Sequence, residues 1–439
     1  MKTSRPLKAI SSNTVFGEGD VFVLFGELFG RGYATGLIDQ AKAAGMTVIG
    51  ITVGRPDENN KPRALTPEEL TEAEANLGGK IINVPLRAGF ELDAPEGTAT
   101  PTDLVNEMTI KDWQDHKLDW DHVEICRGLG SNRFKDALSQ VMDQLDTMIP
   151  AGKNVFFAHT MAGGIPRAKV FMAIANRIYK GRGARYMPSQ SLIESDLGKL
   201  ILQNFEEVTA NSFGYLLEAS KTLRDRVEAA GGEVRYTAYG YHGTRILIED
   251  EYRWQTYTNY TQGYAKMALE KFAEDAWKDG VKATVFNCPE IRTNSSDVFA
   301  GIELSLLPLL QAFKKEGGGA WVDALWQKCE GMLKPEASLE EVLQKVSDYQ
   351  TSEAMQPFYN FEAWPMPNSA EQVDKTVGTS QEIVDLHKER NVLVSDELSQ
   401  HVVAATGMLM FGEASQPEGP ALWLDHDLVA KRLIQEHGA

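Results

Sequence analysis

Three glycines near the N-terminus form the first group of residues whose spacing could do chemistry. Gly26, Gly30 and Gly32 lie in LFGELFGRGYATG (residues 24–36), between an apolar run and an amphipathic run. In a strand–turn–helix unit, such glycines permit a tight turn and let the backbone approach a phosphate. The free N–H groups of the helix N-terminus can then bind the pyrophosphate of a dinucleotide. The stretch therefore predicts a dinucleotide site, and the alternative is a tight turn without a ligand.

The end of the second expected strand bears on which nicotinamide cofactor fits. A carboxylate there would bond the ribose hydroxyls and favour NADH. This strand ends in TVGR instead, and Arg55, Lys61 and Arg63 could meet a 2′-phosphate. Asp57 and Glu58 lie in the same stretch, and a solvated loop is the better interpretation of Lys61 and Arg63. We therefore expect NADPH as the cofactor, with NADH as the alternative.

A tyrosine and a lysine could support hydride transfer to a conjugated carbonyl, which creates an enolate that needs an oxyanion partner and a proton. The segment QTYTNYTQGYAKMALEKFAEDA offers Tyr257, Tyr260 and Tyr264 ahead of Lys266. In a helix, Tyr264 and Tyr260 would lie about 200° and about 240° around the axis from Lys266, facing away from it. Tyr257 would be about 13 Å away if the whole segment were helical. Tyr257 can therefore cooperate with Lys266 only from a loop that folds back before the helix.

The spacing of eight residues between Tyr257 and Lys266 resembles that of the single-chain trans-2-enoyl-ACP/CoA reductases, a branch of the short-chain dehydrogenase/reductase superfamily. GYAKMALE, YHGT, CPEIRTNSSDVFAGIELSLL and the strand exit NVFFAHTMAGGIPRAK are similar to motifs of that family. The resemblance covers residues 12–330. Two features depart from the pattern: the segment between Tyr241 and Tyr257 is longer, and Arg55 stands where the family more often has glutamate.

This resemblance implies an NAD(P)H-dependent reduction of the double bond of a 2-enoyl thioester, carried on ACP or CoA, in fatty-acid or related acyl metabolism. Tyr257 would be the proton donor or oxyanion partner, and Lys266 would anchor the ribose and pyrophosphate. Tyr241 would flank the thioester, while Ile291 and Thr293 would border the nicotinamide carboxamide and the phosphates. The alternatives are a core aromatic residue for Tyr241 and a solvated helix lysine for Lys266.

The end of the fourth expected strand offers further cofactor contacts, because ligands bind at the carboxyl edge of open parallel sheets. Ala158 and His159 lie there, although a structural histidine is an equally good interpretation of His159. No H-x-x-x-H pair or cluster of carboxylates predicts a metal site. The candidate cofactor-binding residues are therefore Gly26, Gly30, Gly32, Tyr33, Arg55, Ala158, His159, Lys266, Ile291 and Thr293.

Two other functions fit much of the same pattern. A carbonyl reductase or 3-hydroxyacyl dehydrogenase would use a tyrosine acid in the same place. A non-catalytic dinucleotide-binding protein would keep the glycines but would not need the pair of Tyr257 and Lys266. A serine hydrolase is not supported, because the sequence has no G-x-S-x-G motif.

The elements that must position these residues alternate along the chain. Apolar runs predict strands over 20–26, 46–54, 79–86, 154–159, 234–243 and 281–288, and helical spacing predicts helices over 33–45, 133–149, 192–230 and 259–280. This alternation predicts a doubly wound, Rossmann-type parallel sheet with helices on both faces. We divide the chain into a dinucleotide-binding and catalytic domain, 12–330, and a mostly helical C-terminal extension, 331–439.

The composition indicates which partners and which cellular compartment fit this protein. The 44 basic and 62 acidic residues give a net charge of −18, which disfavours nucleic acid as a partner. No apolar stretch is long enough to span a membrane. The 3 cysteines are far apart and no signal peptide is recognisable, so we expect a cytoplasmic enzyme. The sequence leaves open whether the protein is a monomer or a homo-oligomer.

Overall fold

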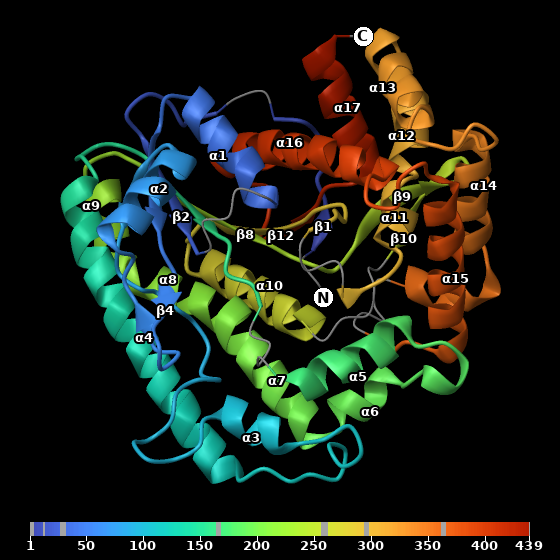
Figure 1. Ribbon diagram of the computed structural model, residues 1–439. Helices are drawn as coiled ribbons and strands as arrows, with labels where there is room; N and C mark the ends of the chain where they lie inside the picture. The colour runs from blue at the N-terminus through green and yellow to red at the C-terminus, as the bar shows by residue number, and fades with distance from the viewer. Residues whose placement is uncertain are drawn as a thin grey trace.

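The computed structural model describes residues 4–11, 14–26, 32–163, 168–255, 262–293, 298–360 and 366–438. Its centre is an 8-stranded sheet in the order β1-β12-β11-β8-β7-β2-β3-β6, in which all neighbouring strands are parallel (Figure 1). This order confirms the predicted doubly wound sheet. The strands are β1 (Arg5–Pro6), β2 (Val21–Phe25), β3 (Thr47–Ile51), β6 (Lys80–Ile82), β7 (Val155–His159), β8 (Val234–Tyr239), β11 (Ala283–Asn287) and β12 (Ala421–Trp423).

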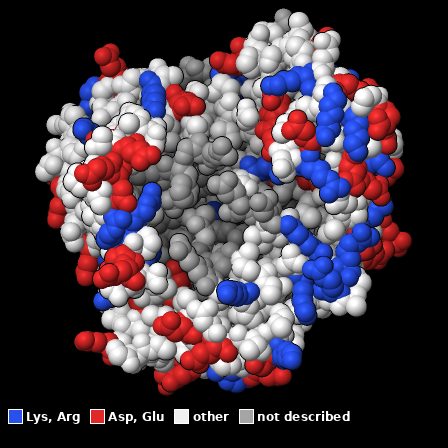
Figure 2. All heavy atoms as spheres, in the orientation of Figure 1, with Lys and Arg blue, Asp and Glu red and all other residues white. Residues whose placement is uncertain are grey.

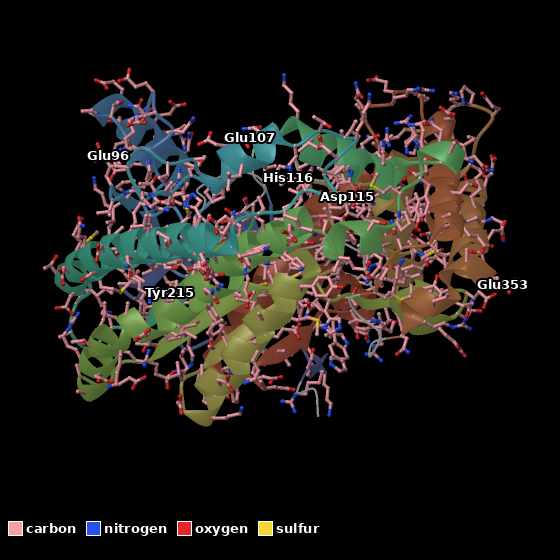
Figure 3. The ribbon with its side chains drawn as sticks, turned by 90° about the horizontal axis from the view of Figure 1, so that it is seen from below. Glu96, Glu107, Asp115, His116, Tyr215 and Glu353 are labelled. Carbon is pink, nitrogen blue, oxygen red and sulfur yellow. The ribbon has the colours of Figure 1, made fainter. Side chains whose placement is uncertain are left out.

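Helices cover both faces of the sheet, because side chains along each strand alternate between the two faces. On β2, Phe22 and Leu24 belong to one apolar cluster, whereas Val21, Val23 and Phe25 belong to the other. The first face packs against α1 (Tyr33–Ala43), α2 (Pro67–Leu77), α12 (Leu309–Glu316), α16 (Val394–Ser415) and α17 (His426–His437). The second packs against α4 (Trp120–Met148), α8 (Ser212–Ala219), α9 (Lys221–Ala229) and α10 (Gln262–Lys278), drawn in teal, green and yellow in Figure 3.

A third apolar cluster joins the first turns of α4 to a group of shorter helices. These are α3 (Pro101–Glu107), α5 (Lys169–Lys180), α6 (Ser189–Ile193) and α7 (Asp196–Glu206), with the 3-10 turn η1 (Gly183–Arg185) between α5 and α6. A π-helical turn, η2 (Glu207–Asn211), separates α7 from α8. The helical stretch predicted over 192–230 is therefore present, but it is broken into several segments.

Residues 331–439 are mostly helical, as predicted, but they also complete the sheet. After α11 (Ile302–Leu306), α12 and α13 (Ala320–Glu330) come α14 (Leu339–Gln350), the 3-10 helix η4 (Glu353–Tyr359), α15 (Ala370–Leu386), α16 and α17. Strand β12, which the sequence analysis did not predict, lies between β11 and β1. Helix α16 also packs on α1 of the first βαβ unit (Figure 1). The division of the chain at residue 330 stays a prediction.

An antiparallel hairpin, β9 (Thr244–Ile248) and β10 (Glu251–Gln255), accounts for the extra length between Tyr241 and Tyr257. It packs against the C-terminal helices: the Arg245 Nε donates to Asp425 Oδ2 at 2.6 Å, and the Tyr252 hydroxyl donates to Glu316 Oε1 at 2.7 Å. A second, very short hairpin, β4 (Arg55–Pro56) and β5 (Pro62–Arg63), follows β3. Both hairpins lie outside the 8-stranded sheet and leave its parallel order unchanged.

The crossing of α1 and α16 gives a prediction about stability. A Cβ on Gly36 would overlap the main chain of Val403 and Gly407. We expect Gly36→Ala to lower the free energy of unfolding by about 1–3 kcal/mol, because the two helices must separate. In α4, a Cβ on Gly128 meets nothing within 4 Å. The matched change Gly128→Ala is expected to raise that free energy by about 0.5–1 kcal/mol. Urea unfolding of both variants checks this, and equal stabilisation by both would contradict it.

Within the described ranges, no helix combines the length and the apolar character needed to cross a membrane.

Candidate active site

The strand ends that carry most of the predicted residues meet at one edge of the sheet. Strands β3, β2, β7, β8 and β11 are neighbours and run in the same direction, so their carboxyl ends lie together. Gly26 follows β2, His159 ends β7, Tyr241 follows β8 and Ile291 follows β11. Ligands of doubly wound folds bind at this edge. The structure therefore brings these predicted residues into one region.

Gly26 and Gly32, the described glycines of the stretch after β2, bear on the predicted pyrophosphate site. Gly26 has a φ of 133°, and a Cβ there would lie 2.7 Å from Thr160 Oγ1 and 2.9 Å from the main-chain N of Met161. Gly32 has a φ of 119° and precedes α1, whose first turn has no acidic residue and no side-chain cap. The N–H groups at this helix N-terminus can therefore serve an anionic ligand. Gly30 lies outside the described residues.

Tyr33, the first residue of α1, joins the glycine turn to the other side of the site. Its hydroxyl donates to the main-chain oxygen of Pro289 at 2.5 Å, just after β11. Its ring stacks on Tyr239, with ring centroids 5.5 Å apart. Tyr33 therefore offers an aromatic wall at the edge of the predicted cofactor site.

Lys266 lies in the first turns of α10, with its amine turned towards the sheet. The side chain is buried, since Lys266 is 8% exposed, and Nζ donates to the main-chain oxygen of Tyr239 at 2.5 Å. Burial lowers the pKa of Lys266 to about 8. The interpretation of Lys266 as a solvated helix lysine is therefore wrong. A buried amine beside the end of β8 is costly to keep unless it serves a ligand or a reaction.

A buried carboxyl group lies next to Tyr241. The Tyr241 hydroxyl donates to Glu290 Oε1 at 2.7 Å, and the Ser305 hydroxyl donates to Glu290 Oε2 at 2.8 Å. Glu290 is 6% exposed, and burial raises its pKa to about 7, although the two hydrogen bonds lower it. The nearby charge of Glu303 also contributes to this rise of the Glu290 pKa. Glu290 is not among the residues predicted from the sequence, although the carboxylate in CPEIRT, just after a predicted strand, could have indicated it.

His159 is a structural histidine. Its Nε2 lies 2.8 Å from the Ser212 Oγ, and that hydroxyl already donates to the main-chain oxygen of Val208 at 2.6 Å. The serine has one hydrogen, so the His159 Nε2 must be the donor of their bond. Burial, with the charge of Lys266, lowers the pKa of His159 to about 3. The imidazole is therefore neutral. The side chains of His159 and Ala158 are buried, so a cofactor would meet the main chain there.

The remaining candidates lie at the rim of the region. Arg55 is exposed on the β4–β5 hairpin, and Arg63 is held by Glu69 through hydrogen bonds of 2.6 and 2.9 Å. Ile291 is buried and Thr293 is exposed, so only Thr293 presents its side chain to solvent. Tyr257 lies outside the described residues. Its distance from Lys266 therefore stays a prediction.

Known proteins place this chain in a family. The model of the family "Enoyl-acyl carrier protein reductase FabMG" matches residues 3–433. The chain belongs to the FabMG enoyl-acyl carrier protein reductases. It is 63% identical to a solved apo structure of FabMG, described as a novel type of enoyl-acyl carrier protein reductase, over 100% of this chain and 98% of that one, with a TM-score of 0.97. An NADH-bound structure of FabMG is 55% identical over 100% of both chains, with a TM-score of 0.82. No curated protein matches this chain.

This membership confirms the resemblance to the enoyl reductases and the predicted enzyme class. The protein is an oxidoreductase that reduces enoyl-ACP in fatty-acid synthesis and depends on a nicotinamide dinucleotide. The two alternatives, a carbonyl reductase and a non-catalytic dinucleotide-binding protein, are not supported. The family match says nothing about the spacing of tyrosine and lysine, so the roles of individual residues of this FabMG reductase rest on its geometry.

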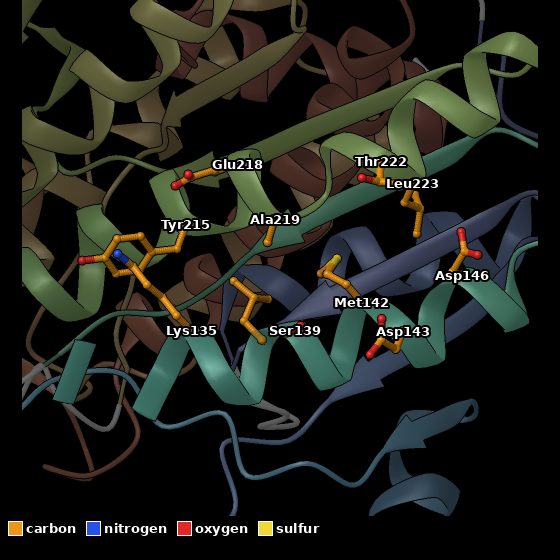
Figure 4. Close-up of a pocket in the computed structure, with 11 residues that line it drawn as sticks. Lys135, Ser139, Met142, Asp143, Asp146, Tyr215, Glu218, Ala219, Thr222 and Leu223 are labelled. Carbon is orange, nitrogen blue, oxygen red and sulfur yellow. The ribbon is translucent and has the colours of Figure 1, made fainter. Parts of the chain in front are cut away.

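The reductase has a second concave region away from this edge. A groove of about 560 Å³ lies between α4 and the α8–α9 pair (Figure 4). Asp143, Asp146 and Glu218 contribute carboxylates to it, with Lys135 at one end (Figure 4). This acidic lining repels a pyrophosphate. The groove is therefore not a second candidate for the cofactor site.

Proposed function

We propose that this FabMG reductase uses NADH to reduce 2-enoyl chains on the acyl carrier protein, with Lys266 as the anchor of the nicotinamide ribose and Tyr257 as the proton donor. The buried amine of Lys266 carries the proposal, because it lies at the carboxyl edge between the ends of β8 and β11. An ammonium has more N–H donors than its bond to Tyr239 uses, so ribose hydroxyls can accept the others. When bound there, reduced nicotinamide supplies a hydride.

The choice of NADH over NADPH rests on charge near the end of β3. A 2′-phosphate needs free cations, but Arg63 is bonded to Glu69 in a two-pronged pair. Arg55 also lies close enough to Glu69 to lower the pKa of that carboxyl, together with Arg63 and the Thr66 main chain. The Glu69 carboxylate therefore offsets both arginines. A relative, FabMG, binds NADH, which points the same way. We therefore propose NADH as the cofactor, in place of the NADPH expected from the sequence.

The proposed role of Tyr241 follows from its surroundings, and that of Tyr257 from the resemblance to the enoyl reductases. Hydride addition to the double bond of the enoyl thioester would leave an enolate oxygen that needs hydrogen-bond donors. Tyr241 is half-buried and its hydroxyl bonds Glu290, so it can donate to this oxygen when Glu290 is protonated and itself donates to the phenol oxygen. Tyr257 supplies the proton in this proposal, on the resemblance to the enoyl reductases. The protonated amine of Lys266 lowers the pKa of a tyrosine placed beside it.

A comparison of substrates tests the proposal. We expect rapid NADH oxidation with crotonyl-ACP and little with acetoacetyl-ACP, since hydride addition to the ketone puts the negative charge on the C3 oxygen and not on the thioester oxygen. NADPH should replace NADH with a kcat/KM at least about tenfold lower. Tyr257→Phe should lower kcat by about 10²-fold. Faster oxidation with acetoacetyl-ACP would overturn the assignment, and unchanged turnover in Tyr257→Phe would overturn the role of that tyrosine.

The three cysteines are buried thiols, which is in keeping with a reducing compartment: Cys126, Cys288 and Cys329. They support the further proposal of a cytoplasmic location.

A further inference from the structure

One segment of this acidic chain has no acidic residue. Residues 147–193 contain no aspartate or glutamate, although the whole chain carries 62 acidic and 44 basic residues. The segment includes β7, α5 and η1. Its lysines and arginines are Lys153, Arg167, Lys169, Arg177, Lys180, Arg182 and Arg185. The charge of this segment is therefore opposite in sign to that of the molecule.

Helix α5 has one buried face and one cationic face. Val170, Phe171, Ile174, Ala175, Ile178 and Tyr179 are buried. The other face presents Lys169, Met172, Ala173, Asn176 and Arg177, all exposed, with the partly exposed Lys180 beyond them. Arg182 and Arg185 of the following turn are exposed as well. Figure 2 shows Lys and Arg side chains gathered over α5, in the lower right of that view, beside the central depression.

Few carboxylates of the protein itself neutralise this face. Arg182 pairs with Asp374 of α15 at 2.6 Å, and Arg185 donates to the side-chain oxygen of Asn176 at 3.0 Å. Lys169 and Arg177 make no ion pair with any described residue. Met172, which is 49% exposed, lies between them in sequence and on the same face. The outward face of α5 thus combines free positive charge with one exposed apolar side chain.

Helix α5 is also close to the active site. Its buried face shares an apolar cluster with Ala265, the residue before Lys266, and with Phe299, which follows β11. The rings of Tyr179 and Phe299 are 4.8 Å apart. Because a helix with its side chains is about 10 Å thick, the cationic face lies roughly one helix away from that cluster. A substrate arm attached to a protein bound on this face could reach the edge where Lys266 lies.

We propose that the outward face of α5, with η1, is the surface that binds the acyl carrier protein, through acidic side chains of the carrier. This inference rests on the proposed function, in which the substrate is attached to such a carrier. With a net charge of −18, most of the reductase repels an acidic protein. A local cationic face reduces this repulsion and orients the carrier as it approaches the reductase. Its effect weakens as added salt screens the charges. Met172 supplies an apolar contact at one side of the face.

Charge reversal tests the surface. We expect Lys169→Glu/Arg177→Glu to lower kcat/KM for crotonyl-ACP at least about tenfold at low salt, mainly through KM. The loss should shrink as salt is added. Turnover of crotonyl-N-acetylcysteamine, a neutral thioester without a carrier, should be unchanged. The matched control is Lys42→Glu/Lys388→Glu, since Lys42 and Lys388 are exposed on other elements and the change in net charge is the same.

The outcomes separate this inference from the proposed function. Unchanged kinetics of the charge-reversed variant with crotonyl-ACP would overturn the proposed binding surface. An equal loss of activity with both thioesters would also overturn it, because it would mean damage to the fold or the active site. An equal loss in the control pair would also overturn it. Failure of the wild-type enzyme to use crotonyl-ACP would instead overturn the proposed function. If the charge-reversed variant does not fold, Lys169→Gln/Arg177→Gln serves in its place, with an expected loss of several-fold.

Discussion

Lys266→Met is expected to lower kcat/KM for crotonyl-ACP by about 10²–10³-fold, the usual cost of removing one preorganised charged donor from an active site. The amine is buried beside the main-chain oxygen of Tyr239, and methionine fills a similar volume without the charge. The loss should appear in kcat and also as weaker binding of NADH, because the amine is the proposed ribose anchor. Steady-state kinetics and a fluorescence titration with NADH measure the two effects.

The stability of the same variant should change in the opposite direction. Burial lowers the pKa of Lys266 from 10.5 to about 8, so the unfolded state holds its proton over a wider pH range than the folded state. The buried charge therefore destabilises the fold fully below about pH 8, and this penalty disappears as pH rises towards 10.5. We expect Lys266→Met to raise the free energy of unfolding by about 1–3 kcal/mol at pH 7, without cofactor.

Lys271→Met is the matched control for this variant. Lys271 lies on the same helix, but its side chain is 59% exposed and pairs with Asp275 on the surface. We expect kinetics and stability close to wild type, because exposed pairs contribute little. A Lys266→Met enzyme with wild-type kinetics, or a large loss in Lys271→Met, would contradict the role of the buried amine.

Glu290→Gln is expected to remove a pH dependence of the reductase. When Glu290 is ionised, the Tyr241 hydroxyl donates its hydrogen to the carboxylate, as the 2.7 Å bond shows. When Glu290 is protonated, it can donate to the phenol oxygen, and the tyrosine hydrogen is free for the thioester. Since burial raises the pKa of Glu290 to about 7, wild-type kcat should fall above that pH, by about tenfold per pH unit.

The amide that Glu290→Gln introduces would donate to the phenol oxygen of Tyr241 at every pH. We therefore expect this variant to keep the low-pH rate and to lose the bend near pH 7, so that only the fall above about pH 8, where Lys266 loses its proton, remains. Glu303→Gln is the matched control, because Glu303 is also buried but raises the Glu290 pKa only through its charge. Its profile should keep the bend, moved to lower pH. A Glu290→Gln profile that bends as in the wild type would contradict the role of Glu290.

The stability of the folded state also depends on the ionisation of Glu290. Its pKa is raised from 4.5 to about 7, so this group favours the folded state fully below pH 4.5, and that contribution is lost as pH rises through 7. We expect Glu290→Gln to be more stable than wild type above pH 8, by about 1–3 kcal/mol. Chemical unfolding at two pH values measures the difference.

Local patterns along the chain determined the elements and the first half of the site. The apolar run before Gly26 and the amphipathic run after Gly32 specify a strand and a helix by their own periodicity. The same is true of β8, α10 and β11, which place Tyr241 just after β8 and Lys266 in the first turns of the helix between β8 and β11. Side-chain spacing is a short-range signal, so these parts of the fold could be predicted without knowing what packs on them.

Contacts between distant residues were decided only by the tertiary structure. Strand β12 is short and lies far along the chain from its neighbours β11 and β1, so its apolar run carries no sign of its partners. The Glu290 site joins residues from the ends of β8 and β11 and from α11. The burial that shifts the pKa values of Glu290 and Lys266 exists only after these elements pack together. The sequence alone thus determined which groups reach the sheet edge, whereas packing decided which of them are buried, charged or bonded to each other.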